Sequence, residues 1–197
     1  IEDFTESIKL KPDANTYYYR GLAKGEINDS SGQKFDLLRS IELEPNSWKA
    51  HYFLGRVLFL AEDYYGALSA LKTYFNLVEW TGDYYDLYSQ YYMSYSLYQE
   101  GFYNKAFEWI NYILTETDFT SVVEPISFDD YYKLRGDIYY ELEDFEFARK
   151  DYEKASEFEP QSALYREVIG DTYAAEKNYE RAIDFYNQAL ELDPNKY

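Results

Sequence analysis

The sequence has no cysteine and a single histidine, His51. Disulfides and thiolate nucleophiles are therefore excluded, and no second histidine can join His51 in a metal site or a catalytic pair. Gly-rich phosphate loops and the H-E-x-x-H and G-x-S-x-G motifs are also missing. We therefore predict no catalytic residue, no metal and no cofactor, and do not expect an enzyme. The lack of cysteine fits a reducing cytoplasm and a bacterial exterior alike, so the compartment stays open.

Glycine and proline are scarce, and no long apolar run is present. Only 9 glycines and 5 prolines occur in 197 residues of which 46% are hydrophobic, a composition typical of an ordered chain. No stretch reaches the roughly 20 apolar residues that a membrane-spanning helix needs, so we expect no membrane insertion. Because the chain begins at Ile1 rather than Met, we expect a fragment of a longer protein.

Positive charge is also in short supply. The chain carries 19 Lys and Arg against 37 Asp and Glu, a formal net charge of -18. Such a charge repels nucleic-acid phosphates and anionic lipid headgroups, which argues against a nucleic-acid partner. Residues 1–98 hold 9 basic against 14 acidic residues, and residues 99–197 hold 10 against 23. The C-terminal half is therefore the better place for a cationic partner.

What the sequence does contain is 26 tyrosines and a repeat. Residues 131–160 align without a gap on residues 165–194 at a shift of 34, and residues 17–45 share their phase. Three small or helix-breaking residues recur at fixed places in this repeat. They are a glycine in a first helix (Gly21, Gly55, Gly136, Gly170), an alanine in a second helix (Ala67, Ala106, Ala148, Ala182) and a closing proline (Pro12, Pro45, Pro160, Pro194).

Each recurring residue has a physical role. A glycine inside a helix costs about 1 kcal/mol relative to alanine, so four at one phase indicate a close approach by the next helix. We expect the small alanine to receive that approach, and the proline to end the second helix. Ser94 replaces the glycine in the third repeat, and Gln33 replaces the alanine in the first, beside a polar N-D-S-S-G turn. We expect looser packing there, and longer connections around residues 80–86 and 119–128.

This pattern resembles the tetratricopeptide repeat family, whose unit is two antiparallel helices in 34 residues. In the last repeat, Tyr173, Ala182, Tyr186, Ala189 and Pro194 follow the glycine at the family's intervals. The resemblance implies an all-α fold, a right-handed superhelical α-solenoid of about five repeats after one leading helix. Since one repeat cannot bury its apolar face alone, we expect residues 1–197 to form a single array. Its units are predicted at residues 1–12 (a leading half repeat), 14–46, 48–80, 86–118, 129–161 and 163–197.

The resemblance also implies that the first helix of each pair lines a concave groove where partners lie as extended peptides or helices. Positions -3, +1 and +4 from the glycine or serine share one helix face. This face is aromatic first and then acidic, which favours a protein or peptide partner with basic and apolar residues. The candidate partner-binding residues are Tyr18, Tyr52, Arg56, Tyr91, Tyr95, Tyr98, Asp137, Tyr140, Glu167 and Asp171.

Other interpretations of these features stay open. Tyrosines at helical spacing also pack repeats together, so the exposure of Tyr91, Tyr95 and Tyr98 decides their role. The leading hypothesis is a non-catalytic interaction scaffold. The alternatives are a structural oligomerisation or spacer module that self-associates through incomplete repeat ends, and a regulatory segment of a larger enzyme or assembly factor.

Overall fold

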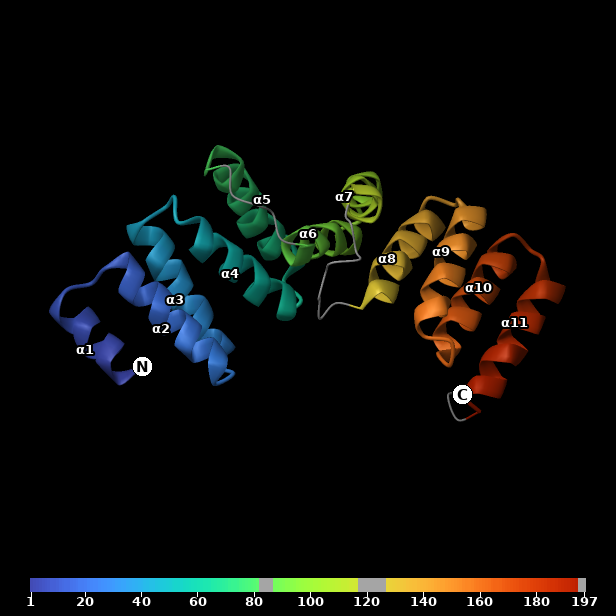
Figure 1. Ribbon diagram of the computed structural model, residues 1–197, viewed down its shortest axis with the longest axis horizontal. Coiled ribbons are helices and arrows are strands. Elements are labelled where there is room, and N and C mark those ends of the chain that lie inside the picture. Colours follow the sequence, from blue (N-terminus) through green and yellow to red (C-terminus); the bar gives the residue numbers. More distant parts are fainter. Residues whose placement is uncertain (82–86, 117–126, 195–197) are drawn as a thin grey trace. The chain divides into compact units, whose positions relative to one another are not determined.

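The computed structural model describes residues 1–81, 87–116 and 127–194. Every regular element in these ranges is an α-helix, which confirms the predicted all-α fold and its leading helix. In chain order the helices (Figure 1) are α1 (Glu2–Leu10), α2 (Ala14–Glu26), α3 (Ser30–Leu43), α4 (Trp48–Leu60), α5 (Tyr64–Thr81), α6 (Leu87–Gln99), α7 (Tyr103–Glu116), α8 (Phe128–Glu141), α9 (Phe145–Phe158), α10 (Ala163–Ala175) and α11 (Tyr179–Leu192).

The chain divides into two compact units, Ile1–Gly101 and Phe102–Tyr197. In the first unit α2 packs on α3 and α4 packs on α5, and in the second α8 packs on α9 and α10 packs on α11. These are the helix pairs that the repeat predicts. The division falls between α6 and α7, inside the predicted third repeat, and the single array over residues 1–197 stays a prediction.

The predicted long connections are only partly visible. Helix α5 continues to Thr81, so the expectation that residue 80 begins a connection was wrong. Phe128 likewise belongs to α8. The rest of the two predicted connections, residues 82–86 and 119–126, lies outside the described residues. No helix in the described ranges combines the length and the apolar character of a membrane-spanning segment.

The turn inside each pair has one geometry. Seven residues after the glycine or serine position, φ is positive at Asn28, Glu62, Gly101, Glu143 and Lys177. In four of these turns the next N–H donates to a carbonyl five residues back, as from Asp63 to Leu58 (2.9 Å) and from Asn178 to Tyr173 (2.8 Å). This bond closes the first helix in the manner of a Schellman motif. In three of these four turns the Asp or Asn side chain then caps the second helix, as when Asp63 Oδ1 accepts from the Gly66 N–H at 3.0 Å.

The recurring glycines make room for a large side chain of the second helix. A Cβ on Gly136 would lie 2.6 Å from Cε1 of Tyr152, and one on Gly170 would lie 2.6 Å from Cε1 of Tyr186. Both tyrosines stand sixteen residues after their glycine, and the same position in other repeats holds the fully buried Leu37, Leu71 and Ile110. The alanine takes part in this approach as predicted, since the Ala182 carbonyl oxygen lies 3.3 Å from a Cβ on Gly170, but the closest atoms belong to the larger side chain. The alanine is buried one helical turn earlier, and the larger side chain covers the glycine.

Two buried ion pairs tie successive helices together. Arg20 on α2 donates from Nε and Nη2 to both oxygens of Asp36 on α3, at 2.8 and 2.6 Å, and from Nη1 to Thr5 on α1 at 3.2 Å. Burial alone would raise the pKa of Asp36, but the hydrogen bonds from Arg20 and Lys24 hold the pKa below its ordinary value. Each pair therefore holds three consecutive helices in a fixed arrangement.

The second pair repeats this geometry in the other unit. Arg135 on α8 donates to both oxygens of Asp151 on α9, at 2.7 and 2.8 Å, and to Asn111 on α7 at 2.9 Å. Its position relative to Gly136 is that of Arg20 relative to Gly21. The sequence analysis did not identify this pair, although an Arg before the glycine and an Asp sixteen residues after that Arg mark both copies.

The left-handed turn yields a stability prediction. Replacing Glu62 by glycine removes the steric cost of a side chain at φ 59° and should raise the free energy of unfolding by about 0.5–1 kcal/mol in urea denaturation. Lys72→Gly is the matched control, because it places glycine at an exposed position inside α5 and should lower stability by about 1 kcal/mol. Equal losses from both variants would contradict this account of the turn.

Candidate functional site

Two predicted groove carboxylates are each held by a tyrosine of the second helix. The Tyr152 hydroxyl donates to Asp137 Oδ1 at 3.0 Å, and the Tyr186 hydroxyl donates to Asp171 Oδ1 at 2.8 Å. These are the tyrosines that cover Gly136 and Gly170, and each aspartate directly follows its glycine. The close helix approach that packs the repeat therefore also orients the carboxylate beside it.

Asp137 has its charge compensated inside its own helix. Lys133 Nζ lies 2.6 Å from Asp137 Oδ2, and only 17% of the aspartate side chain is exposed. Burial raises the pKa of Asp137 above its ordinary value, against the opposing effects of Lys133 and the Tyr152 hydroxyl. Asp137 consequently offers less negative potential to a partner than the sequence analysis expected.

Asp171 lies in a different environment. Among the described residues it forms no ion pair, and its hydrogen bond comes from the neutral Tyr186 hydroxyl. The pKa of Tyr186 is raised to about 12. Burial is the largest cause, the hydrogen-bonded Asp171 is the next, and Tyr140 and Glu167 add to the effect. The pKa of Tyr140 is likewise raised, by burial and by Asp171. Tyr186 is hydrogen bonded to Asp171, and Tyr140 and Glu167 lie within electrostatic range of this pair. We call Tyr140 from α8, Glu167 and Asp171 from α10 and Tyr186 from α11 the acidic patch.

In the first unit, the predicted tyrosine stripe is part of an aromatic cluster. The Tyr95 ring centroid lies 5.4 Å from Phe59, 5.8 Å from Tyr64, 5.9 Å from Tyr91 and 6.3 Å from Tyr98. Tyr91, Tyr95 and Tyr98 are half-buried. They therefore pack on one another and on α4 and α5, and still keep part of each ring exposed. The packing role of the stripe is thus observed, and its role in partner binding stays a prediction.

The remaining groove candidates differ in exposure. Tyr18 is only 8% exposed and packs edge-on against Phe53 of the next helix pair at 5.9 Å, so it belongs to the core and offers little surface to a partner. The inner-face rule, by which positions -3, +1 and +4 from the glycine or serine face the groove, does not account for Tyr18. The rule considers one helix and takes no account of the Phe53 ring on α4. Tyr52 is half-buried, and its ring centroid lies 5.4 Å from that of Tyr74. Arg56 is exposed.

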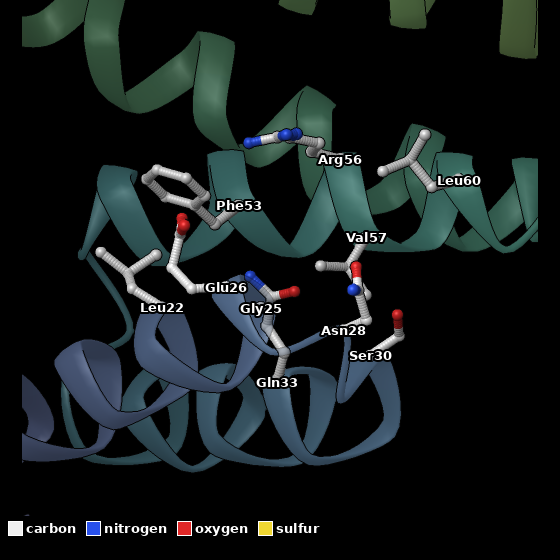
Figure 2. Close-up of a pocket in the computed structure, with 10 residues that line it drawn as sticks. All are labelled: Leu22, Gly25, Glu26, Asn28, Ser30, Gln33, Phe53, Arg56, Val57 and Leu60. Carbon is white, nitrogen blue, oxygen red and sulfur yellow. The ribbon is translucent and has the colours of Figure 1, made fainter. Parts of the chain in front are cut away.

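Arg56 lines a cavity of about 280 Å³ between α2, α3 and α4. This cavity lies where Gln33 replaces the repeat's alanine and where Gly25 stands at the position held by Phe59, Tyr98 and Tyr140 in other repeats. The expected looser packing of the first repeat therefore takes the form of a defined opening (Figure 2). Its lining residues are Leu22, Gly25, Glu26, Asn28, Ser30, Gln33, Phe53, Arg56, Val57 and Leu60.

Sequence comparison assigns the C-terminal part of the chain to a family. Residues 133–197, which span nearly all of the last two helix pairs, match the family model described as tetratricopeptide repeat. This part of the chain carries tetratricopeptide repeats. For these residues the match confirms the family that the glycine, alanine and proline spacing indicates.

Solved tetratricopeptide-repeat structures share the fold over nearly the whole length. The structure of YrrB, described as a TPR protein with an unusual peptide-binding site, is 18% identical with a TM-score of 0.76, and the match covers 98% of this chain and 93% of that one. MamA from Desulfovibrio magneticus RS-1 is 17% identical with a TM-score of 0.73, and the match covers 93% of this chain and 96% of that one. No curated protein sequence matches the chain. At such identities the likeness shows the tetratricopeptide-repeat fold alone.

Three residues of the site lie outside the inner face that the repeat predicts. Tyr152 and Tyr186 hold the groove carboxylates, and Glu26 lines the cavity beside Arg56. The spacing of sixteen residues from the glycine marks the two tyrosines in the sequence. Glu26 has no such signal, because it lies at the end of α2, outside the predicted inner face.

The raised pKa of Tyr186 can be measured directly. With 13C-labelled tyrosine ring carbons, NMR titration should give a pKa of about 12 for Tyr186, and Asp171→Asn should lower it because the neighbouring negative charge is removed. Since the folded pKa exceeds the unfolded value near 10, this tyrosine's stabilising contribution should be complete below pH 10 and lost as the pH rises through about 12. An Asp171→Asn variant with an unchanged Tyr186 titration would contradict the hydrogen bond.

Proposed function

We propose that this chain is a non-catalytic interaction scaffold that binds a protein or peptide segment carrying basic and apolar residues. The observation that carries the proposal is the acidic patch. There Asp171, which forms no ion pair among the described residues, accepts a hydrogen bond from Tyr186 and acts electrostatically on Tyr140, while Glu167 acts on Tyr186. The fold is that of an interaction module, and YrrB, which shares it, is described as having a peptide-binding site.

The acidic patch suits a Lys or Arg side chain in two ways. Its two carboxylates supply negative potential in a half-buried setting, where charges interact more strongly than in open solvent. The Tyr140 ring offers a rigid apolar surface for the aliphatic stem of the same side chain, at little cost in side-chain entropy. Asp137 contributes less, because Lys133 already compensates its charge.

The aromatic cluster of the first unit would supply apolar contacts. Tyr91, Tyr95 and Tyr98 keep part of each ring exposed while neighbouring rings hold them in place. Preorganised tyrosines lose little conformational freedom on binding, which makes them effective contact residues. Tyr52 has the same half-buried character.

A selection experiment tests this proposal. Random dodecapeptides displayed on phage should be enriched on the intact chain for Lys or Arg next to aromatic or aliphatic residues. A selected peptide should bind the Glu167→Gln/Asp171→Asn variant about tenfold more weakly, a loss of roughly 1.4 kcal/mol, with a smaller dependence of affinity on salt. Isothermal titration calorimetry measures both quantities.

The control variant is Glu153→Gln/Asp184→Asn, which makes the same charge change at exposed positions of α9 and α11. It should bind the selected peptide as the unmodified chain does. Selection of acidic peptides would overturn the proposal, and so would equal losses in both double variants.

A second candidate function, structural self-association, is favoured by the exposed apolar residues of α11. Tyr179 is 61% exposed, Ile183 57% and Leu190 40%, and they recur at helical spacing. If this stripe joins copies of the chain, the mass measured by sedimentation equilibrium should rise with concentration, and Ile183→Asp should return it to the monomer value. A monomer at every concentration would exclude this function for the chain.

A further inference from the structure

The cavity in the first helix pair has the size of a subsite for one side chain. Its volume of about 280 Å³ falls just below the range of roughly 300–1,000 Å³ found for small-molecule sites. Its shape follows from two residues. Gly25 leaves space where three other repeats carry a ring and the last repeat carries Ala174, and a Cβ on Gly25 would lie 2.6 Å from the Gln33 amide nitrogen. The amide of Gln33 is therefore packed directly under the backbone of α2.

The lining combines an apolar wall with hydrogen-bonding groups. Leu22, Phe53, Val57 and Leu60 provide the apolar wall, and Asn28, Ser30 and Gln33 provide two amides and a hydroxyl. In Figure 2, Leu22 and Phe53 lie at one end, while Asn28 and Ser30 lie below Val57 and Leu60 at the other. Such a lining fits a side chain with an apolar stem and a polar end.

Two charged residues of opposite sign complete the lining. Glu26 enters from the end of α2 beside Phe53, and Arg56 comes from α4 (Figure 2). Among the described residues neither forms an ion pair, so the two side chains are more than 4 Å apart and do not neutralise each other by contact. Both keep hydrogen-bonding capacity for a ligand.

The balance of these charges selects the ligand's chemistry. A Lys side chain would be attracted by Glu26 but repelled by Arg56, and a Glu side chain would meet the opposite forces. In either case the attraction to one residue is offset by the repulsion from the other, so a charged side chain has no net Coulombic gain. A primary amide is neutral and has donors at one end and an acceptor at the other, which match the carboxylate and the guanidinium respectively.

We propose that this cavity binds the side-chain amide of a glutamine or asparagine in a bound peptide. The NH2 group donates to Glu26, the carbonyl accepts from Arg56, and the methylene stem lies on Phe53 and Leu22. The inference rests on the proposed function in one respect, that the ligand is a peptide. It adds a side-chain specificity that neither the aromatic cluster nor the acidic patch supplies.

The test uses short blocked peptides and the intact 15N-labelled chain. The probes are N-acetyl-Gly-X-Gly-N-methylamide with X as Gln, Glu, Lys or Leu, so that X supplies the single variable group. The Gln probe should shift the side-chain amides of Asn28 and Gln33 and the backbone amides of Gly25 and Gly32, and should saturate at a Kd at least fivefold lower than the other three. Equal or tighter binding of the Leu, Lys or Glu probe would overturn the inference.

Charge variants give a second and sharper readout. Glu26→Gln leaves Arg56 as the only charge of the lining, so the preference should move to the Glu probe. Arg56→Gln leaves Glu26, so the preference should move to the Lys probe. Glu44→Gln and Lys49→Gln are the matched controls, since they make the same charge changes at exposed positions of the same unit, and they should keep the preference for Gln. An unchanged order of probes in Glu26→Gln and Arg56→Gln would refute the role of the two charges.

The outcomes separate this inference from the proposed function. The tripeptides report on residues 22–60 alone, whereas the double variant of Glu167 and Asp171 reports on the second unit. Gln-selective shifts together with failure of the dodecapeptide selection would retain the cavity and reject the basic and apolar partner. The opposite pattern would reject the cavity and retain that partner.

Discussion

The contact on which the rest of the structure depends is the close approach of two helices at a glycine. At Gly136 and Gly170 the ring of Tyr152 or Tyr186 lies where a Cβ would be, so the second helix rests directly on the backbone of the first. Any larger residue would push the two helices apart and weaken the packing on both sides. Because the next residue is an aspartate, the same contact brings a tyrosine hydroxyl to a carboxylate. Repeat packing and the geometry of the candidate site thus share one cause.

Charge is distributed so that several cations are used inside the protein. Arg20 and Arg135 form bidentate pairs with buried aspartates, and Lys133 is bound to Asp137. With 19 basic residues against 37 acidic ones, each internal pair removes one cation and one anion, so the other residues keep the whole net charge of -18. In the proposed binding role, Asp171 and Glu167 are distinguished by where they lie, since Asp171 accepts a hydrogen bond from Tyr186 and both act electrostatically on that tyrosine. Net charge alone would not distinguish them from solvated carboxylates elsewhere on the helices.

The repeat made the helices and their pairing predictable, because glycine, alanine and proline act through the backbone and through close contact, which do not depend on distant residues. Side-chain exposure was less predictable. Tyr18 fits the inner-face rule, yet Phe53 of the following pair covers it. Asp137 fits the rule as well, but Lys133 one turn earlier compensates its charge. These outcomes depend on neighbours of particular size and charge, which a rule about one helix face does not contain. The cavity beside Arg56 could be anticipated only as looser packing around Gln33.

Departures from the repeat are therefore where binding specificity can arise. The position after the glycine or serine is occupied by Leu22, Arg56, Tyr95, Asp137 and Asp171 in successive pairs, so one backbone site presents apolar, cationic, aromatic and anionic groups. Packing constrains the glycine and the residue sixteen positions later but leaves this position free to vary. Gly25 and Gln33 alter the packing itself, and they open a cavity at the position where Phe59, Tyr98 and Tyr140 place a ring in other pairs. The fold thus follows from what the repeats share, whereas the proposed ligand preferences rest on where they differ.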